Sequence, residues 1–231
     1  MILHVLERAL AARNVARAIV ATDDERILDV VKGAGFEAVM TRGDHASGSD
    51  RLAEVAATLN ETEAIVNLQG DEPLVAPQTI ERAVDKLFED ESAQVVTTSE
   101  EISDAADVLS ADVVKVVTDE EGRALYFSRS PIPFPREAVR KYGTLVAALE
   151  IEPALLATFR KHTGLYVYRR SFLLEYTRWP QSTLERAEAL EQLRALERGV
   201  KIKVIEAHSP SIGVDTEQDL ERVRKIVNSE Q

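Results

Sequence analysis

Acidic residues follow three of the apolar segments that are typical of β-strands. Asp23 follows Thr22, Asp71 follows Gln69-Gly70, and Asp215 follows Gly213-Val214. In open parallel α/β sheets, ligands bind beyond the carboxyl ends of the strands. Carboxylates from separate strand ends suit a hard cation such as Mg²⁺, which usually shares its coordination sphere with substrate phosphates. The pattern at Asp71 and Asp215 therefore predicts a magnesium site and phosphoryl or nucleotidyl transfer.

A structural role is the competing interpretation of each aspartate. An aspartate after a strand commonly closes a turn or caps the next helix. Asp23 and Asp24 are both good capping residues ahead of an expected helix, so we interpret Asp23 as a cap. For Asp71 the preceding Gly70 favours a ligand, since a glycine lets the backbone approach a bound molecule closely.

Other familiar motifs do not indicate a site. The run Gly33-Ala34-Gly35-Phe36-Glu37-Ala38 matches a dinucleotide fingerprint in letters, but it leaves a helix and enters a strand, the reverse of what phosphate binding needs. The sequence has no GxxxxGK[ST] loop, no HExxH and no GxSxG. The four histidines are too scattered for a zinc site that the sequence alone would reveal.

Short apolar strands alternate with amphipathic helices over the first half of the chain, which predicts a parallel sheet covered by helices. After about residue 110, strands at 113–119 and 124–129 joined by a Gly122 turn predict a hairpin. One long helix is expected over 182–199, and Thr216 is expected to cap a last helix. We therefore predict one domain, with a core at about 1–110 and 200–231 and an insertion at about 111–199.

Composition narrows the class of protein. The 231 residues carry 40 acidic and 28 basic side chains, a formal charge of -12, which argues against binding to nucleic acid or to an anionic membrane. There is no cysteine, so thiol chemistry and disulfides are excluded. The amphipathic N-terminus resembles neither a signal peptide nor a membrane span, so we expect a cytoplasmic protein.

Six motifs in order resemble one enzyme family over nearly the whole chain: TRGDHASGSDRLAEV, IVNLQGDEPLV, VVKVVTDEEGRALYFSRSPIP, HTGLYVYRR, LERAEALEQLRALERG and GVDTEQDLERVR. The chain resembles the 3-deoxy-manno-octulosonate (Kdo) cytidylyltransferases. The resemblance implies a Rossmann-like nucleotidyltransferase α/β core with a mostly parallel sheet and a hairpin-containing insertion. It also implies transfer of CMP from CTP to Kdo, which gives CMP-Kdo and diphosphate for lipopolysaccharide synthesis. A homodimer and Mg²⁺ are expected with it.

The resemblance assigns roles by motif. Asp71 and Asp215 become the magnesium ligands, and Gln69 a catalytic residue between nucleotide and sugar. Nucleotide contacts are expected from Ser47, Gly48, Arg51 and Gln69, and sugar-acid contacts from Arg129, His162, Tyr166, Glu191 and Gln192. An arginine suits the sugar's carboxylate through paired charge-assisted hydrogen bonds, whereas the other side chains suit hydroxyl groups.

Each sugar-binding assignment has a structural alternative. Glu191 and Gln192 fall in the long charged helix, where such residues usually face water. Arg129 could anchor the PIPFP loop, and His162 could be a surface histidine. Tyr166 and Tyr168 alternate with apolar residues, so one of these tyrosines is expected in the core.

One departure from the family concerns the N-terminus. The family opens with a strand and a loop close to IPARYxSTRLPGKPL, and Met1 aligns after that loop. Either Met1 is an internal methionine of a longer product or the short form is real, and we favour the first explanation. We expect the 231-residue chain to turn over slowly, because the loop's basic residues hold the triphosphate. Another sugar-acid cytidylyltransferase, of the sialic acid type, and a non-catalytic dimer-forming homologue remain alternatives.

Overall fold

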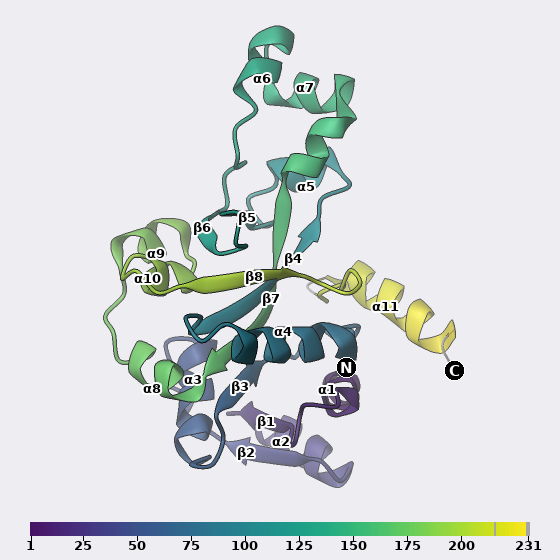
Figure 1. Cartoon of the computed structure of the whole chain (residues 1–231). Coiled ribbons are helices and arrows are strands. Elements are labelled where there is room, and N and C mark those ends of the chain that lie inside the picture. The colour runs from purple at the N-terminus through teal and green to yellow at the C-terminus, as the bar shows by residue number, and fades with distance from the viewer. Residues whose placement is uncertain (215, 230–231) are drawn as a thin grey trace. The chain divides into compact units, whose positions relative to one another are not determined.

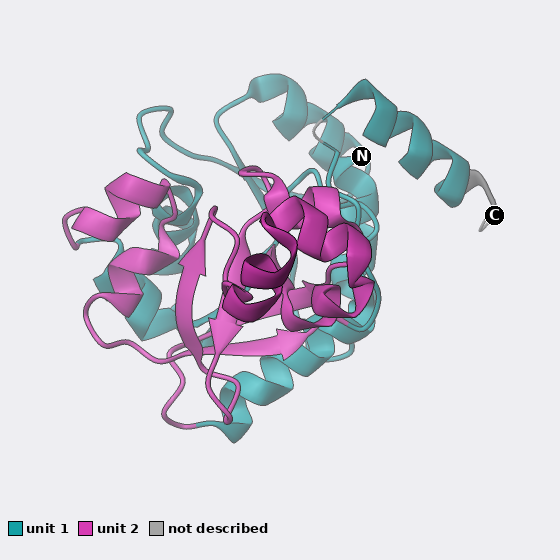
Figure 2. Ribbon diagram, turned by 90° about the horizontal axis from the view of Figure 1, so that it is seen from above, with its two compact units in different colours: residues 1–90, 165–178, 208–231 teal, residues 91–164, 179–207 magenta. Residues whose placement is uncertain are grey.

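The computed structural model describes residues 1–214 and 216–229 and has a mixed α/β fold, as predicted (Figure 1). The chain divides into two compact units (Figure 2). Unit 1 contains Met1–Asp90, Leu165–Arg178 and His208–Gln231, and unit 2 contains Glu91–Gly164 and Trp179–Ala207. These bounds differ from the predicted insertion at 111–199, and the single-domain organisation stays a prediction.

Unit 1 contains two pairs of strands with helices between them. Strand β1 (Ile19–Thr22) runs parallel to β2 (Glu37–Met40), and β3 (Ala64–Asn67) runs antiparallel to the second half of β7 (Arg160–Arg169). Its helices are α1 (Ile2–Ala11), α2 (Glu25–Gly33), α3 (Gly48–Ala57), α4 (Pro77–Glu89), α8 (Arg170–Tyr176) and α11 (Glu217–Ser229).

Apolar residues at helical and strand spacing form one core cluster of unit 1. Leu6 of α1, Val20 of β1, Val31 of α2 and Ala38 of β2 are all buried together. Gly35 takes a φ of 84°, a left-handed conformation that favours glycine, and it lies just after the end of α2. Near the C-terminus, the Thr216 hydroxyl accepts from the Asp219 backbone N–H at 3.2 Å, so the predicted cap of α11 is confirmed.

Unit 2 contains the predicted hairpin. Strands β5 (Lys115–Thr118) and β6 (Ala124–Ser128) pair antiparallel, and Gly122 takes a φ of 72° in the turn between them. Strand β4 (Val95–Glu101) runs parallel to β8 (Ile202–Glu206), and Lys115 of β5 lies opposite Lys161 of β7. The helices are α5 (Ala105–Leu109), α6 (Arg136–Tyr142), α7 (Leu145–Ile151), α9 (Thr183–Glu188) and α10 (Gln192–Leu196), with a 3₁₀ turn at Pro153–Thr158.

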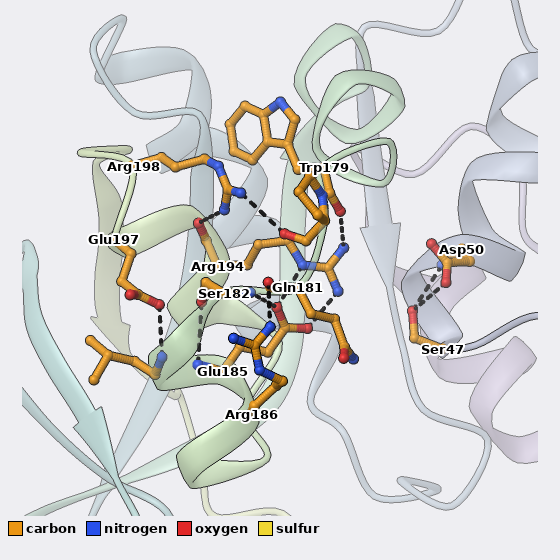
Figure 3. Close-up of polar contacts among 12 residues, drawn as sticks. Ser47, Asp50, Trp179, Gln181, Ser182, Glu185, Arg186, Arg194, Glu197 and Arg198 are labelled. Atoms are coloured by element: carbon orange, nitrogen blue, oxygen red, sulfur yellow. Dashed lines mark hydrogen bonds and ion pairs between the residues drawn. The ribbon is translucent and has the colours of Figure 1, made fainter.

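The prediction of one long helix over 182–199 is wrong. Helix α9 begins with the Ser182–Glu185 capping box but ends at Glu188, because Ala189 takes a left-handed φ of 52°. The break lets Arg194 of α10 reach Glu185, with Nη2–Oε1 and Nε–Oε2 distances of 2.5 and 2.8 Å (Figure 3). In a continuous helix, residues nine positions apart would lie about 13.5 Å apart on opposite sides. Tertiary contact therefore overrides the helical pattern here.

None of the helices in the described part of the chain is long and apolar enough to cross a bilayer.

Candidate active site

The acidic turn that follows β3 is closed by its own backbone. The Glu72 N–H donates to the Gln69 carbonyl at 3.2 Å, so residues 69–72 form a β-turn with Gly70 at its second position. A Cβ on Gly70 would lie 3.4 Å from Cδ1 of Ile2, so the turn packs closely against α1. Gln69 is exposed and Asp71 is half-buried.

The segment that precedes Asp215 is bonded to this turn. The Val214 N–H donates to the Asp71 carbonyl at 2.9 Å, and the Ser211 hydroxyl donates to the Glu72 carboxylate. Among the described residues, the Asp71 carboxylate has no hydrogen-bond or ion-pair partner. Asp215 itself lies outside the described residues, so the convergence of the two aspartates on one ion stays a prediction.

Asp23 pairs with Arg51, one of the predicted nucleotide-binding residues. Arg51 Nη1 lies 2.5 Å from Asp23 Oδ1, and this hydrogen bond lowers the pKa of the Asp23 carboxyl. The expectation that Asp23 caps α2 is wrong, because Asp24 is the N-cap and accepts from the Arg26 N–H at 2.8 Å. The predicted pair therefore does supply the cap, but through Asp24, and Asp23 instead binds Arg51 of α3.

Ser47 caps α3, and Gly48 is the first residue of that helix. Ser47 Oγ accepts from the Asp50 backbone N–H at 3.2 Å and donates to the Asp50 carboxylate at 3.1 Å (Figure 3). A Cβ on Gly48 would meet no atom of the described chain within 4 Å, so the start of the helix is open to a neighbouring molecule. The same loop contributes to a cavity of about 470 Å³ lined by Arg42, Asp44, His45, Ala46, Asp50, Glu54 and Thr177.

Tyr166 lies at the junction of β7 and β3 in unit 1. It pairs with Asn67, the last residue of β3, and stacks on Tyr168 with ring centroids 5.7 Å apart. Tyr168 is buried and Tyr166 is partly exposed, which confirms the expectation that one of the two tyrosines belongs to the core.

Arg129 in unit 2 is held by backbone carbonyls. Its Nε donates to the Glu188 carbonyl at 2.8 Å, and its terminal nitrogens donate to the carbonyls of Ala111 at 2.9 Å and Ala189 at 3.4 Å. The side chain thus anchors the end of α9 and the segment before β5. Three of its five N–H groups are used in this way.

His162 is enclosed between β4 and β6 in unit 2. Its Nε2 lies 2.9 Å from the Thr97 hydroxyl, and the Phe127 ring meets it edge-on with centroids 5.0 Å apart. Desolvation lowers the pKa of His162 to about 3, so the imidazole is neutral at pH 7. His162 is partly buried and lies inside β7, so it is not a freely exposed histidine before a strand.

Glu191 and Gln192 lie at the start of α10, immediately after the break at Ala189. Gln192 is only 8% exposed, so the expectation that it faces water on a long helix is wrong. A network that includes Glu185, Arg194 and the Trp179 carbonyl fixes this segment (Figure 3). Sequence reasoning missed Lys115 and Glu188, which both bind the backbone of Arg129.

The donor set at the acidic turn fits a magnesium ion. Within residues 1–214 and 216–229, no group of three or more histidine or acidic side chains could hold a metal by itself. Mg²⁺ needs fewer protein ligands, since one or two carboxylates together with substrate phosphates usually bind it. Asp71 supplies a half-buried carboxylate with no other partner in the described chain, and this is the observation on which the fit depends.

Two solved structures resemble this chain over nearly its whole length. One, of CMP:2-keto-3-deoxy-manno-octonic acid synthetase complexed with CTP, superposes with a TM-score of 0.87 at 41% identity, covering 100% of this chain and 88% of that one. The other, 4-diphosphocytidyl-2C-methyl-D-erythritol synthase from Anaerococcus prevotii, covers 98% of this chain and 89% of its own with a TM-score of 0.58 at 13% identity, and shows the fold alone. These likenesses confirm the predicted fold class.

Sequence comparison identifies the family. The cytidylyltransferase family model matches residues 1–202. A 3-deoxy-manno-octulosonate cytidylyltransferase from Syntrophotalea carbinolica is 52% identical over 96% of this chain and 86% of its own length, and one from Geobacter sulfurreducens is 51% identical over 96% and 87%. The chain therefore belongs to the cytidylyltransferase family and, within it, to the 3-deoxy-manno-octulosonate cytidylyltransferases.

Proposed function

We propose that this protein transfers CMP from CTP to Kdo and releases diphosphate, as the step that activates Kdo for lipopolysaccharide synthesis. The observation that carries the proposal is its identity of about half over nearly the whole length with enzymes of that name. The solved structure with a TM-score of 0.87 contains CTP, which supports CTP as the nucleotide. The geometry contributes the Asp71 carboxylate, without a partner in the described chain, at the turn where a cation and phosphates would meet.

Asp71, together with Asp215, would hold Mg²⁺. When bound, the ion would neutralise phosphate charge and polarise the reacting oxygens. The chain's own contribution is to keep Asp71 in place through the closed turn and the bond from Val214. Glu72 is bonded to Ser211, so it stabilises the turn rather than serving as a ligand.

The nucleotide side of the proposed site lies in unit 1. Arg51 keeps a fixed direction because Asp23 binds one of its terminal nitrogens, and its side chain is still 24% exposed. We propose that Arg51 contacts the cytidine and that the open start of α3 at Gly48 lets the nucleotide approach Ser47. The exposed Gln69 would lie between nucleotide and sugar.

Most of the residues proposed to bind the sugar acid belong to unit 2, and Tyr166 belongs to unit 1. Two N–H groups of Arg129 remain after its three carbonyl contacts within the described chain, which matches in number the two oxygens of one carboxylate. Because His162 is neutral, it would bind a sugar hydroxyl rather than the carboxylate. Tyr166, Glu191 and Gln192 would make the remaining contacts.

A single-turnover assay tests the function. The protein is used in excess over CTP, so that slow turnover is still detected, with Kdo and Mg²⁺ present, and CMP-Kdo and diphosphate are measured. We expect one of each per CTP, and competition by an equal concentration of sialic acid should leave the yield of CMP-Kdo unchanged. Preferential transfer to sialic acid would establish the alternative enzyme, and a stable oligomer with no product would establish the non-catalytic one.

We also propose a homodimer. Unit 2 leaves Leu125, Phe134 and Ile151 each 60% exposed, and Val146 45% exposed. An interface requires exposed apolar side chains that lie together in one patch, and these four are the candidates that we propose for the dimer contact. Sedimentation equilibrium should give twice the 25.6 kDa chain mass, and a monomer at micromolar concentration would refute this assembly.

A further inference from the structure

Three side-chain N–H groups of Arg129 have carbonyl partners within unit 2, and both polar groups of its backbone have side-chain partners there. The Arg129 N–H donates to Glu188 Oε2 at 3.0 Å, and its carbonyl accepts from Lys115 Nζ at 2.6 Å. The side chain reaches back to the Glu188 carbonyl at 2.8 Å. Lys115 and Glu188 thus hold the residue from both sides.

Lys115 is a buried cation whose three donors are all used. Its side chain lies on β5 opposite Ser128 of β6 and is 0% exposed. Besides Arg129, its ammonium donates to the carbonyls of Ser110 at 2.7 Å and Val113 at 2.6 Å. Burial lowers the pKa of Lys115, and the nearby Arg129 charge lowers it further. A buried ammonium is tolerated only when it is fully hydrogen-bonded, so Lys115 fixes the three carbonyls around it.

Glu188 joins the end of β6 to the end of α9. Its carboxylate accepts from the Ser128 hydroxyl at 2.7 Å as well as from the Arg129 N–H. It is the last residue of α9, and the left-handed Ala189 follows it directly. The segment fixed in this way leads, within four residues, to Glu191 and Gln192.

We propose that Lys115 and Glu188 are positioning residues for the sugar-acid subsite, which act by fixing Arg129 and the 188–192 segment. The inference rests on the proposed function, because it takes the ligand of Arg129 to be the carboxylate of a sugar acid. Paired hydrogen bonds from a guanidinium to a carboxylate depend on direction, and a small displacement weakens both of them. Neither Lys115 nor Glu188 needs to touch the substrate, since all of their bonds described here are to the protein.

The test uses two variants of the full chain, Glu188→Gln and Lys115→Met, in the single-turnover assay. In Glu188 each carboxylate oxygen accepts one hydrogen bond, from the Ser128 hydroxyl or from the Arg129 N–H. The glutamine of Glu188→Gln has only one accepting oxygen, because its other polar atom is a donor, so one of these two bonds is lost. We expect the half-saturating concentration of Kdo to rise about tenfold, and the protein concentration that half-saturates the limiting CTP to stay within about twofold. Lys203→Met is the matched control, since the Lys203 ammonium donates to the Glu121 carbonyl in the same unit.

The outcomes separate this inference from the proposed function. A wild type that makes no CMP-Kdo refutes the proposed function, and this inference with it. A wild type that makes CMP-Kdo, with variants whose dependence on Kdo is unchanged, refutes the inference alone. Equal increases for Kdo and CTP would also refute it, because they indicate a general structural loss. If Lys115→Met does not fold, Glu188→Gln decides by itself.

Discussion

Replacing His162 by glutamine should remove a pH dependence of stability from unit 2. His162 is neutral in the folded protein because burial opposes its protonation, and its pKa falls from 6.5 to about 3. Glutamine can still bond to the Thr97 hydroxyl that His162 Nε2 meets at 2.9 Å, but it does not titrate. The variant therefore isolates the protonation of one ring.

The sign follows from which state binds the proton first. The unfolded chain protonates His162 near pH 6.5, whereas the folded protein does so only near pH 3. The stability that the neutral ring contributes is complete above pH 6.5 and is lost as the pH falls toward 3. Between pH 7 and pH 5, linkage gives a loss of about 2 kcal/mol in the free energy of unfolding. This loss should be present in the wild type and absent from His162→Gln.

Urea unfolding at pH 7 and pH 5 measures the difference. Trp179 is the single tryptophan and belongs to unit 2, the unit that contains His162, so its fluorescence follows the right part of the chain. His4→Gln is the matched control for the replacement of a histidine by glutamine, because the His4 side chain lies outside unit 2 and is 43% exposed. If the wild type and His162→Gln lose the same free energy between the two pH values, the imidazole is not desolvated and the reasoning is refuted.

Three further changes test other parts of the site. Asp71→Asn should lower the single-turnover rate about a hundredfold or more, because it would remove a charge from the proposed magnesium site, while the exposed Asp29→Asn should not. Equal rates would exclude Asp71 as a ligand. Arg51→Lys should raise about tenfold the protein concentration that half-saturates the limiting CTP and leave the half-saturating concentration of Kdo unchanged, because lysine lacks the planar fork. An unchanged value for CTP would exclude Arg51 as a nucleotide contact. Arg194→Met should destabilise unit 2 by about 3–5 kcal/mol in urea unfolding, because it leaves the 3%-exposed Glu185 without its cation; a loss below about 1 kcal/mol would show that water reaches the pair.

Local signals in the sequence predicted most of the elements. The helix end at Gly35, the hairpin turn at Gly122 and the cap at Thr216 each depend on one residue type whose chemistry acts over a few positions. The break at Ala189 had no such signal, because alanine is a strong helix former. The break accompanies the pairing of Glu185 with Arg194, a contact that exists only after the chain has folded.

The same distinction separates the site residues that sequence could predict from those it could not. The turn at Asp71 was visible because a glycine and a proline flank the acids. Lys115 was missed because a lysine in a strand ordinarily faces water, and its partners are three backbone carbonyls that no sequence pattern specifies. The partners of Arg129 are likewise backbone atoms, so its position depends on the fold rather than on neighbouring residue types.

The two acidic residues of the turn after β3, Asp71 and Glu72, have different roles: Glu72 stabilises the turn, and Asp71 is the proposed ligand. A carboxylate that is half-buried without a partner is costly, and a fold retains it more easily when a neighbouring residue stabilises the backbone. Glu72 provides this stabilisation by binding Ser211, while the Asp71 carbonyl binds Val214 and leaves the Asp71 carboxylate unused within the described chain. A bound cation would supply the missing partner of the Asp71 carboxylate. Removing Mg²⁺ and CTP should therefore change the surroundings of the Asp71 carboxylate and leave the bond between Glu72 and Ser211 intact. Glu72→Gln should consequently weaken the fold of unit 1 and still permit transfer, which is the opposite of the behaviour expected from Asp71→Asn.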